Sequence, residues 1–153
     1  MNDSIEVELK IPTGTLYGTL LLPVAEAPVT LAVFHAGSGP SDRDGNSDGS
    51  PERHDSLKLL AENLAMQGIA TLRFDKRGVG KSEPALARME DLRFENNIED
   101  IVSWLEYARK DSRFDKIVTV GHSEGSLISM IASHKFGADA YVSIAGAGRP
   151  AWE

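Results

Sequence analysis

The stretch best suited to chemistry is VTVGHSEGSLISM at residues 118–130, where a glycine-flanked serine stands between two apolar runs. The first run is rich in β-branched residues and predicts a strand, and the second has the spacing of a helix. Between them, Gly121 and Gly125 flank Ser123. The turn is so tight that these two flanking positions have no room for a side chain. The turn would expose Ser123 as a nucleophile, and the helix beginning at Glu124 would direct N–H groups toward developing negative charge. The alternative is a plain turn in which Ser123 caps the helix.

A second segment, HAGSGPSDRDGN at residues 35–46, follows the apolar run of residues 29–34. Small residues allow a backbone N–H to approach a substrate oxygen, as an oxyanion site with two donors requires. We expect Gly37 to supply this donor beside the N–H of Glu124, with Ser38 as the alternative. A glycine-rich loop without a functional role is the simpler interpretation.

The segment DKRGVGKSE at residues 75–83 resembles phosphate-binding loops. A P-loop would need glycine at position 75, where the chain has Asp75, and a dinucleotide-binding loop would need glycine at position 83, where it has Glu83. Because both patterns fail, we expect no nucleotide and no other cofactor.

The elements that must position these segments alternate along the chain. Residues 5–11 and 15–23 predict an antiparallel hairpin at a sheet edge. Further strands are expected at residues 29–34, 69–74, 116–121 and 140–146, and helices at residues 56–68, 93–110 and 124–135. In the helix over residues 93–110, the buried stripe is expected to contain Ile98, Ile101, Val102, Leu105 and Tyr107 or Ala108. This order predicts an α/β fold, with a mostly parallel sheet covered by helices on both faces and an N-terminal antiparallel hairpin.

The segments HAGSGP, DKRGVGKS and GHSEG stand in this order at the ends of three successive expected strands. Together they resemble the α/β-hydrolase superfamily over essentially the whole chain, most closely its serine-peptidase-like and esterase-like bacterial branch. The resemblance implies Ser123 as nucleophile and the Glu124 N–H as an oxyanion donor. It implies that Asp75, Arg77 and Gly78 shape the neighbouring loop without a catalytic role. The implied reaction is hydrolysis of a carboxylic ester, or a related amide or thioester, through an acyl-enzyme on Ser123.

In the superfamily the nucleophilic serine belongs to a catalytic triad, whose acid and histidine base follow the serine along the chain. No residue after Ser123 in this sequence is placed to fill either role. His134 lies roughly 16 Å from Ser123 along the expected helix, whereas a general base must lie within about 3 Å. Asp139 precedes the last strand, at the opposite end of the sheet. We therefore expect residues 1–153 to form a single domain, the N-terminal portion of a hydrolase that lacks the last strands and is inactive alone. Gene truncation, the choice of expressed residues and proteolysis all stay open as its origin.

Three histidines precede the serine. We expect His122 to point away from Ser123 and to serve packing. His35, at the end of a strand, is expected to hydrogen-bond the following loop, and His54 is expected to be solvated.

A competing function would use metal. The calcium-loop positions 1, 3, 5, 6 and 12 are matched by Asp44, Asn46, Asp48, Gly49 and Asp55. Against calcium, Pro51 stands at position 8, aspartate replaces the usual glutamate at position 12, and no helix precedes the loop. A solvated acidic loop is the plain interpretation, so no metal is expected. A non-catalytic binding module with calcium in residues 44–55 is the alternative function.

Composition narrows the partners. The chain of 153 residues has a net charge of −7 and no cysteine, which argues against nucleic acid and anionic membranes and excludes disulfides. The acidic start resembles no secretory signal, and no apolar run reaches the roughly 20 residues of a membrane span. We expect a cytoplasmic protein with a small-molecule acyl substrate. We also expect self-association through the sixth strand, whose outer edge would lack a neighbour.

Overall fold

The computed structural model describes residues 2–26, 28–47 and 49–149. Its strands are β1 (Asp3–Ile11), β2 (Gly14–Leu22), β3 (Val29–His35), β4 (Ala70–Phe74), β5 (Phe114–His122) and β6 (Ala140–Ile144). Its α-helices are α1 (Ser56–Met66), α2 (Phe94–Arg109) and α3 (Glu124–Phe136), and its 3₁₀ helices are η1 (Gly80–Ala85) and η2 (Met89–Asp91).

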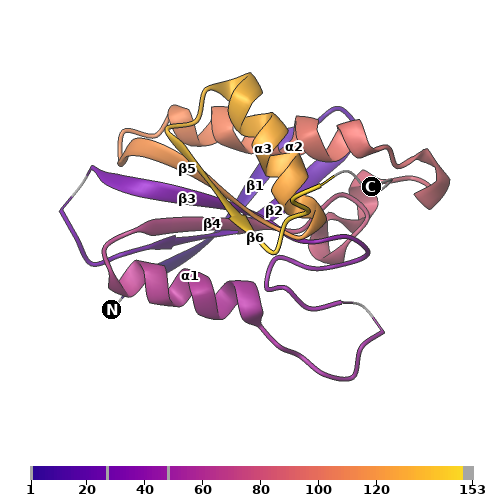
Figure 1. The fold of residues 1–153 in the computed structure, drawn as a ribbon, viewed down its shortest axis with the longest axis horizontal. Helices are drawn as coiled ribbons and strands as arrows, with labels where there is room; N and C mark the ends of the chain where they lie inside the picture. Colours follow the sequence, from indigo (N-terminus) through magenta and orange to yellow (C-terminus); the bar gives the residue numbers. More distant parts are fainter. Residues whose placement is uncertain (1, 27, 48, 150–153) are drawn as a thin grey trace.

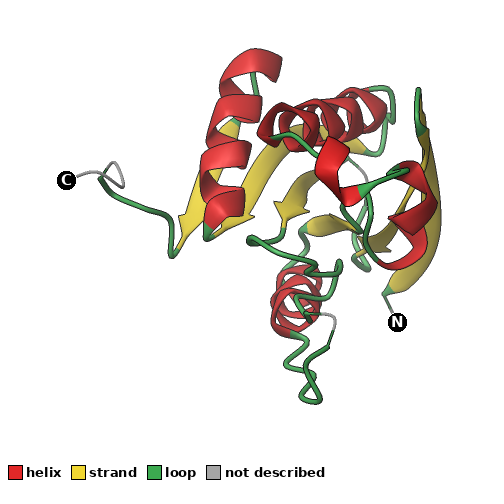
Figure 2. Cartoon of the chain, turned by 90° about the vertical axis from the view of Figure 1, so that its right-hand side faces the viewer, coloured by secondary structure: helices red, strands yellow, loops and turns green. Residues whose placement is uncertain are grey.

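Within these residues the six strands form one sheet in the order β1-β2-β4-β3-β5-β6. The hairpin β1–β2 is antiparallel and joins β4 in antiparallel pairing, whereas β4, β3, β5 and β6 run parallel. Helices α2 and α3 cover one face of the sheet and α1 covers the other (Figures 1 and 2). The α/β fold, the edge hairpin and the helices on both faces are confirmed.

The central strands are apolar because both of their faces are covered. All five residues of β4 are buried, as are the last five of β3. By contrast, β6 has no buried residue, which fits its place at the end of the sheet.

The buried face of α2 differs in part from the expected stripe. Ile98, Ile101 and Leu105 are buried as expected, and of the alternatives Tyr107 and Ala108 it is Ala108 that is buried, whereas Val102 is only half-buried. Trp104 instead lies at the centre of this face, fully buried, with its ring 5.7 Å from that of Phe74. The reason is helical geometry, since residue 104 is three positions after Ile101 and shares its face. Tyr107 packs edge-on against the Trp104 ring from outside.

The parallel strands place three loops at one edge of the sheet. His35 pairs with Gly121 at the end of β3 and β5, and Phe34 pairs with Arg73 near the end of β4. The loops after β3 and β4 and the turn after β5 therefore meet, as expected for function in a parallel sheet.

Candidate active site

Ser123 makes the turn from β5 into α3 with an unusual backbone, φ 54° and ψ −121°. A residue other than glycine rarely adopts a positive φ, and such backbone strain concentrates at functional sites. The Ser123 N–H donates to the Ile144 carbonyl at 2.9 Å, which ties the turn to the end of β6. The strand–turn–helix setting proposed for Ser123 is therefore present, and the serine does not cap the helix with its side chain.

The flanking glycines are required by close approach. A Cβ on Gly121 would lie 2.2 Å from the Gly125 carbonyl oxygen. A Cβ on Gly125 would lie 2.4 Å from the His35 carbonyl oxygen and 2.5 Å from that of Ala36. No real side chain tolerates such distances, so the expectation that both positions must be glycine is confirmed.

Two backbone N–H groups beside Ser123 could donate hydrogen bonds to a negatively charged oxygen. Glu124 is the first residue of α3, so its N–H has no acceptor within the helix. The loop after β3 lies against the serine, since a Cβ on Gly37 would be 3.4 Å from the Ser123 Cβ. Gly37, Ser38 and Ser123 line one cavity of about 230 Å³, together with residues of the long loop. The structure thus brings all four expected site residues together.

Lys76, which the sequence did not single out, holds the loop after β3. Its ammonium donates to the Gly37 carbonyl at 2.5 Å and to the Gly39 carbonyl at 2.6 Å. The residue is only 7% exposed, and burial lowers the pKa of Lys76 to about 8, opposed by the nearby charge of Glu124. In the sequence Lys76 stands two residues after a buried strand, which by itself does not indicate a buried lysine.

A second cavity of about 310 Å³ lies on the Lys76 side of this loop. Its lining is mostly apolar and comes from the loops after β3 and β4, from η2 and from the starts of α2 and α3: Gly39, Pro40, Lys76, Val79, Met89, Leu92, Asn97 and Glu124. It offers space for an apolar group next to the serine turn.

The three histidines before Ser123 differ in burial. His35 is buried and its Nδ1 donates to the Ala36 carbonyl at 2.9 Å, so the expected bond to the loop is confirmed. Burial lowers the pKa of His35 to about 4, which keeps the ring neutral. His54 is exposed, as expected. His122 is exposed too, and the packing role expected for it is wrong.

His122 lies beside the serine for a geometric reason. It shares the sheet face of Val120, which packs under α1. Residue 122 lies past the point where α1 covers that face, so its ring lines the same cavity as Ser123. A Cβ on Gly37 would be 3.2 Å from the His122 Nδ1.

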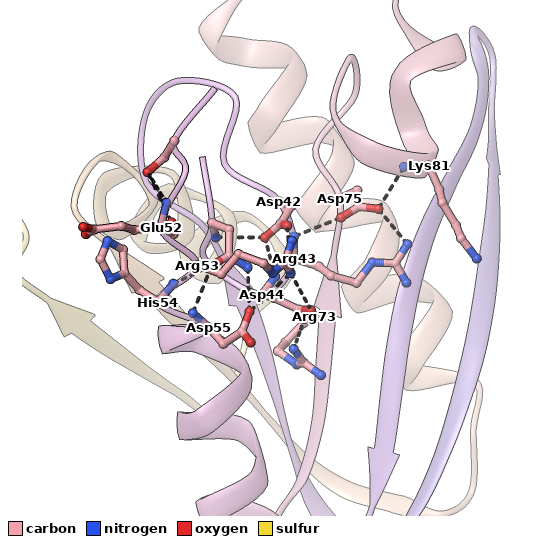
Figure 3. A network of polar contacts seen from close by, with 12 residues as sticks. Asp42, Arg43, Asp44, Glu52, Arg53, His54, Asp55, Arg73, Asp75 and Lys81 are labelled. Carbon is pink, nitrogen blue, oxygen red and sulfur yellow. Dashed lines mark hydrogen bonds and ion pairs between the residues drawn. The ribbon is translucent and has the colours of Figure 1, made fainter. Parts of the chain in front are cut away.

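Figure 3 shows how the long loop before α1 is fastened to the end of β4. The Asp75 carboxylate accepts from the Arg43 backbone N–H at 2.9 Å and from the Arg43 guanidinium at 2.7 Å, and it also accepts the Lys81 N–H at 3.1 Å. Arg73 donates to Asp44. Asp75 thus shapes the loops around the site through one buried charge pair, with Arg43, and through hydrogen bonds from two backbone N–H groups.

The calcium interpretation finds no support in the described residues, which contain no cluster of three or more acidic or histidine side chains able to hold a metal ion. Asp44 pairs with Arg73, and the amide of Asn46 donates to Asp55 at 2.7 Å. The Asn46 side-chain oxygen accepts the N–H groups of His54 and Asp55. Asp48 lies outside the described residues.

Arg77 ties the loop after β4 to α2. Its Nε and Nη2 donate to the two oxygens of Asp100 at 2.7 and 2.5 Å, with both side chains buried. This hydrogen bonding to Asp100 raises the pKa of Arg77. The loop-shaping role implied for Arg77 thus has a contact behind it.

The residues after Ser123 lie where the sequence placed them. Asp139 accepts the Ile117 N–H at 2.8 Å, near the opposite end of β5, and His134 is exposed in the last turn of α3. Among the hydrogen bonds of the described residues, none involves the Ser123 hydroxyl. The described residues thus contain the strained serine and two candidate N–H donors. Neither His134 nor Asp139 lies where it could act as the base for Ser123.

This sheet with its strained strand–serine–helix turn defines the chain as an α/β hydrolase in fold. Residues 48–153 match the family described as serine aminopeptidase, S33. The chain belongs to this family. No helix within the described ranges is long and apolar enough to cross a membrane.

Named relatives agree with this class. The chain is 29% identical over 144 residues to the esterase EstD of Thermotoga maritima, covering 94% of this chain but 33% of that protein. A solved α/β serine hydrolase without a lid from Xanthomonas campestris is similar at 27% identity and a TM-score of 0.72, with 99% of this chain and 65% of that one covered. A dienelactone hydrolase from Anabaena variabilis shares the fold, with a TM-score of 0.72 at 22% identity over 95% of this chain and 64% of that one. The chain therefore spans between a third and two thirds of these relatives' lengths.

Proposed function

We propose that this chain carries the nucleophile half of a serine hydrolase that cleaves carboxylic esters, or related amides or thioesters, through an acyl-enzyme on Ser123. The observation that supports this most strongly is the backbone of Ser123, strained at φ 54° between β5 and α3. Such strain costs about 1–3 kcal/mol and persists only where the surroundings enforce it. A plain turn would have no need of it.

In the proposed reaction the Ser123 oxygen attacks the carbonyl carbon while its proton passes to a base. The carbonyl oxygen becomes an oxyanion held by the Glu124 N–H and by an N–H of the loop after β3. Collapse expels the alcohol, which takes the proton, and water then releases the acid and frees Ser123. Two relatives, one named as an esterase and one as a serine hydrolase, agree with this reaction class.

The base and its orienting acid are proposed to lie beyond these 153 residues. His134 and Asp139 face away from the serine end of the sheet, and the relatives are longer than this chain. Removing the base of a triad leaves only the effect of the oxyanion site. Residues 1–153 alone are therefore proposed to be nearly inactive.

The apolar cavity beside Glu124 is proposed to hold the acyl or alcohol group of the substrate. Its volume of about 310 Å³ and its mostly apolar lining suit a small apolar group.

The test is ester hydrolysis by a protein that contains this chain together with the further residues its relatives have. Ser123→Ala should lower kcat by roughly five to six orders of magnitude, whereas Ser112→Ala, at an exposed serine far from the turn, should leave it unchanged. Retained hydrolysis by Ser123→Ala would refute the nucleophile. Ordinary turnover by the 153-residue chain alone would refute the missing base.

A further inference from the structure

Lys76 binds the one loop whose backbone must face the substrate oxygen, yet its own side chain lies on the other side of that loop. It lines the apolar cavity with Gly39. Gly37 and Ser38 line the neighbouring cavity with Ser123. At Gly37 and Ser38 the loop after β3 therefore lies between Lys76 and Ser123, whereas Glu124 at the start of α3 reaches the cavity of the lysine.

Peptide geometry turns this placement into a direction. The Gly37 carbonyl points at the Lys76 ammonium, 2.5 Å away. In a planar trans peptide the carbonyl and the following N–H point in opposite directions. The N–H of Ser38, which shares this peptide, therefore points away from Lys76, toward the cavity that contains Ser123.

The neighbouring peptide points elsewhere. The Ala36 carbonyl accepts from the His35 ring and lies over Gly125, where a Cβ would be 2.5 Å from its oxygen. The Gly37 N–H belongs to this peptide and so points away from the start of α3. Of the two candidate donors in the loop, Ser38 has the better direction.

We infer that Lys76 is a positioning residue that fixes the Gly37–Ser38 peptide, so that the Ser38 N–H rather than the Gly37 N–H faces Ser123. The inference rests on the proposed function for its purpose, because the N–H would complete the oxyanion site. It does not need hydrolysis for its test.

The inference can be tested by changing the protonation of Lys76 with pH. Its pKa of about 8 reflects burial, and the charged or titratable groups that act on it are Glu124 at the start of α3 and His35 on β3. Its chain neighbours are engaged elsewhere, Asp75 with Arg43 and Arg77 with Asp100. Loss of the proton near pH 8 weakens both bonds to the loop carbonyls.

The experiment is carbon-detected NMR of the labelled 153-residue chain from pH 6 to 10. In the wild type, the carbonyl ¹³C shifts of Gly37 and Gly39 should change together with the Lys76 side chain, with a midpoint near 8. Lys76→Met and Lys76→Arg should both lack this step, and Arg, which stays charged, should keep the wild-type low-pH carbonyl shifts. Lys81→Met, at an exposed lysine of η1, should titrate like the wild type.

Direction is read from proton–proton NOEs to the Ser123 β protons. The Ser38 amide proton should give a stronger NOE than the Gly37 amide proton, and Lys76→Met should lose this preference while Lys76→Arg keeps it. A stronger Gly37 NOE, or an unchanged carbonyl step in Lys76→Met, overturns the inference. Neither result depends on turnover, so failure of the hydrolase assignment shows separately in the Ser123→Ala experiment.

Discussion

At the scale of single residues, His35 links the site to stability. The ring is fully enclosed at the end of β3, and its Nε2 has no partner among the described residues. Protonation would place a charge there beside the Lys76 ammonium. The folded protein therefore prefers the neutral ring, and the pKa of His35 is about 4, against 6.5 in the unfolded chain.

This difference predicts a loss of stability in acid. Between pH 6.5 and 4 the His35 ring is protonated in the unfolded chain but stays neutral in the folded chain. The free energy of unfolding therefore falls as the pH falls. The contribution of His35 is about 3 kcal/mol, fully present above pH 6.5 and lost by pH 4. Urea unfolding at a series of pH values should show this slope in the wild type and a flatter one in His35→Leu.

The matched control is His54→Gln, which alters an exposed histidine. It should keep the wild-type slope. Equal slopes in the wild type and His35→Leu would contradict the prediction.

At the scale of elements, the buried pair between Arg77 and Asp100 joins the loop after β4 to α2. Both side chains are less than a tenth exposed and share two hydrogen bonds. Replacing one partner leaves the other charge buried and alone, which typically costs about 3–5 kcal/mol. Asp100→Asn should therefore lower the free energy of unfolding by about that amount in urea titrations.

A solvent-exposed pair provides the comparison. Arg88 and Asp91 also form two hydrogen bonds, but their side chains are 66% and 47% exposed. Exposed pairs contribute about 0–1 kcal/mol, so Asp91→Asn should change stability little. Similar losses in the two variants would show that the buried pair does not hold the loop.

The elements were predictable from the sequence because the covering of a strand determines its composition. The central strands are continuously apolar, β1 alternates, and the glycines around Ser123 leave one feasible turn. Lys76 was not predictable, since a lysine is normally exposed and only the tertiary fold shows that two carbonyls enclose it. His122 was misjudged because the extent of α1 over its face is a property of packing.

At the scale of the whole molecule, the two edges of the sheet differ. The β1 edge carries Glu6, Glu8 and Lys10, and such charges discourage pairing with another strand. The β6 edge has the sequence AYVSI without a charge, and Val142 is 45% exposed. We propose that the 153-residue chain self-associates through β6.

Light scattering at micromolar concentration tests this proposal. The wild-type chain should scatter as a dimer or larger species, and Val142→Lys should shift it toward monomer. Val24→Lys, at an apolar residue that is 73% exposed outside the strands, should leave the association unchanged. A stable wild-type monomer would rule out pairing at this edge.

The strand order also determines when the strands can pair during synthesis. β3 lies between β4 and β5, both of which leave the ribosome later, and its pairing with β5 joins residue 29 to residue 114. Contacts between such distant parts of a chain form slowly, and a growing chain keeps incomplete sheets exposed. One side of β3 therefore stays unpaired until residues 114–122 have been synthesised, and the strained turn at Ser123 cannot form before them.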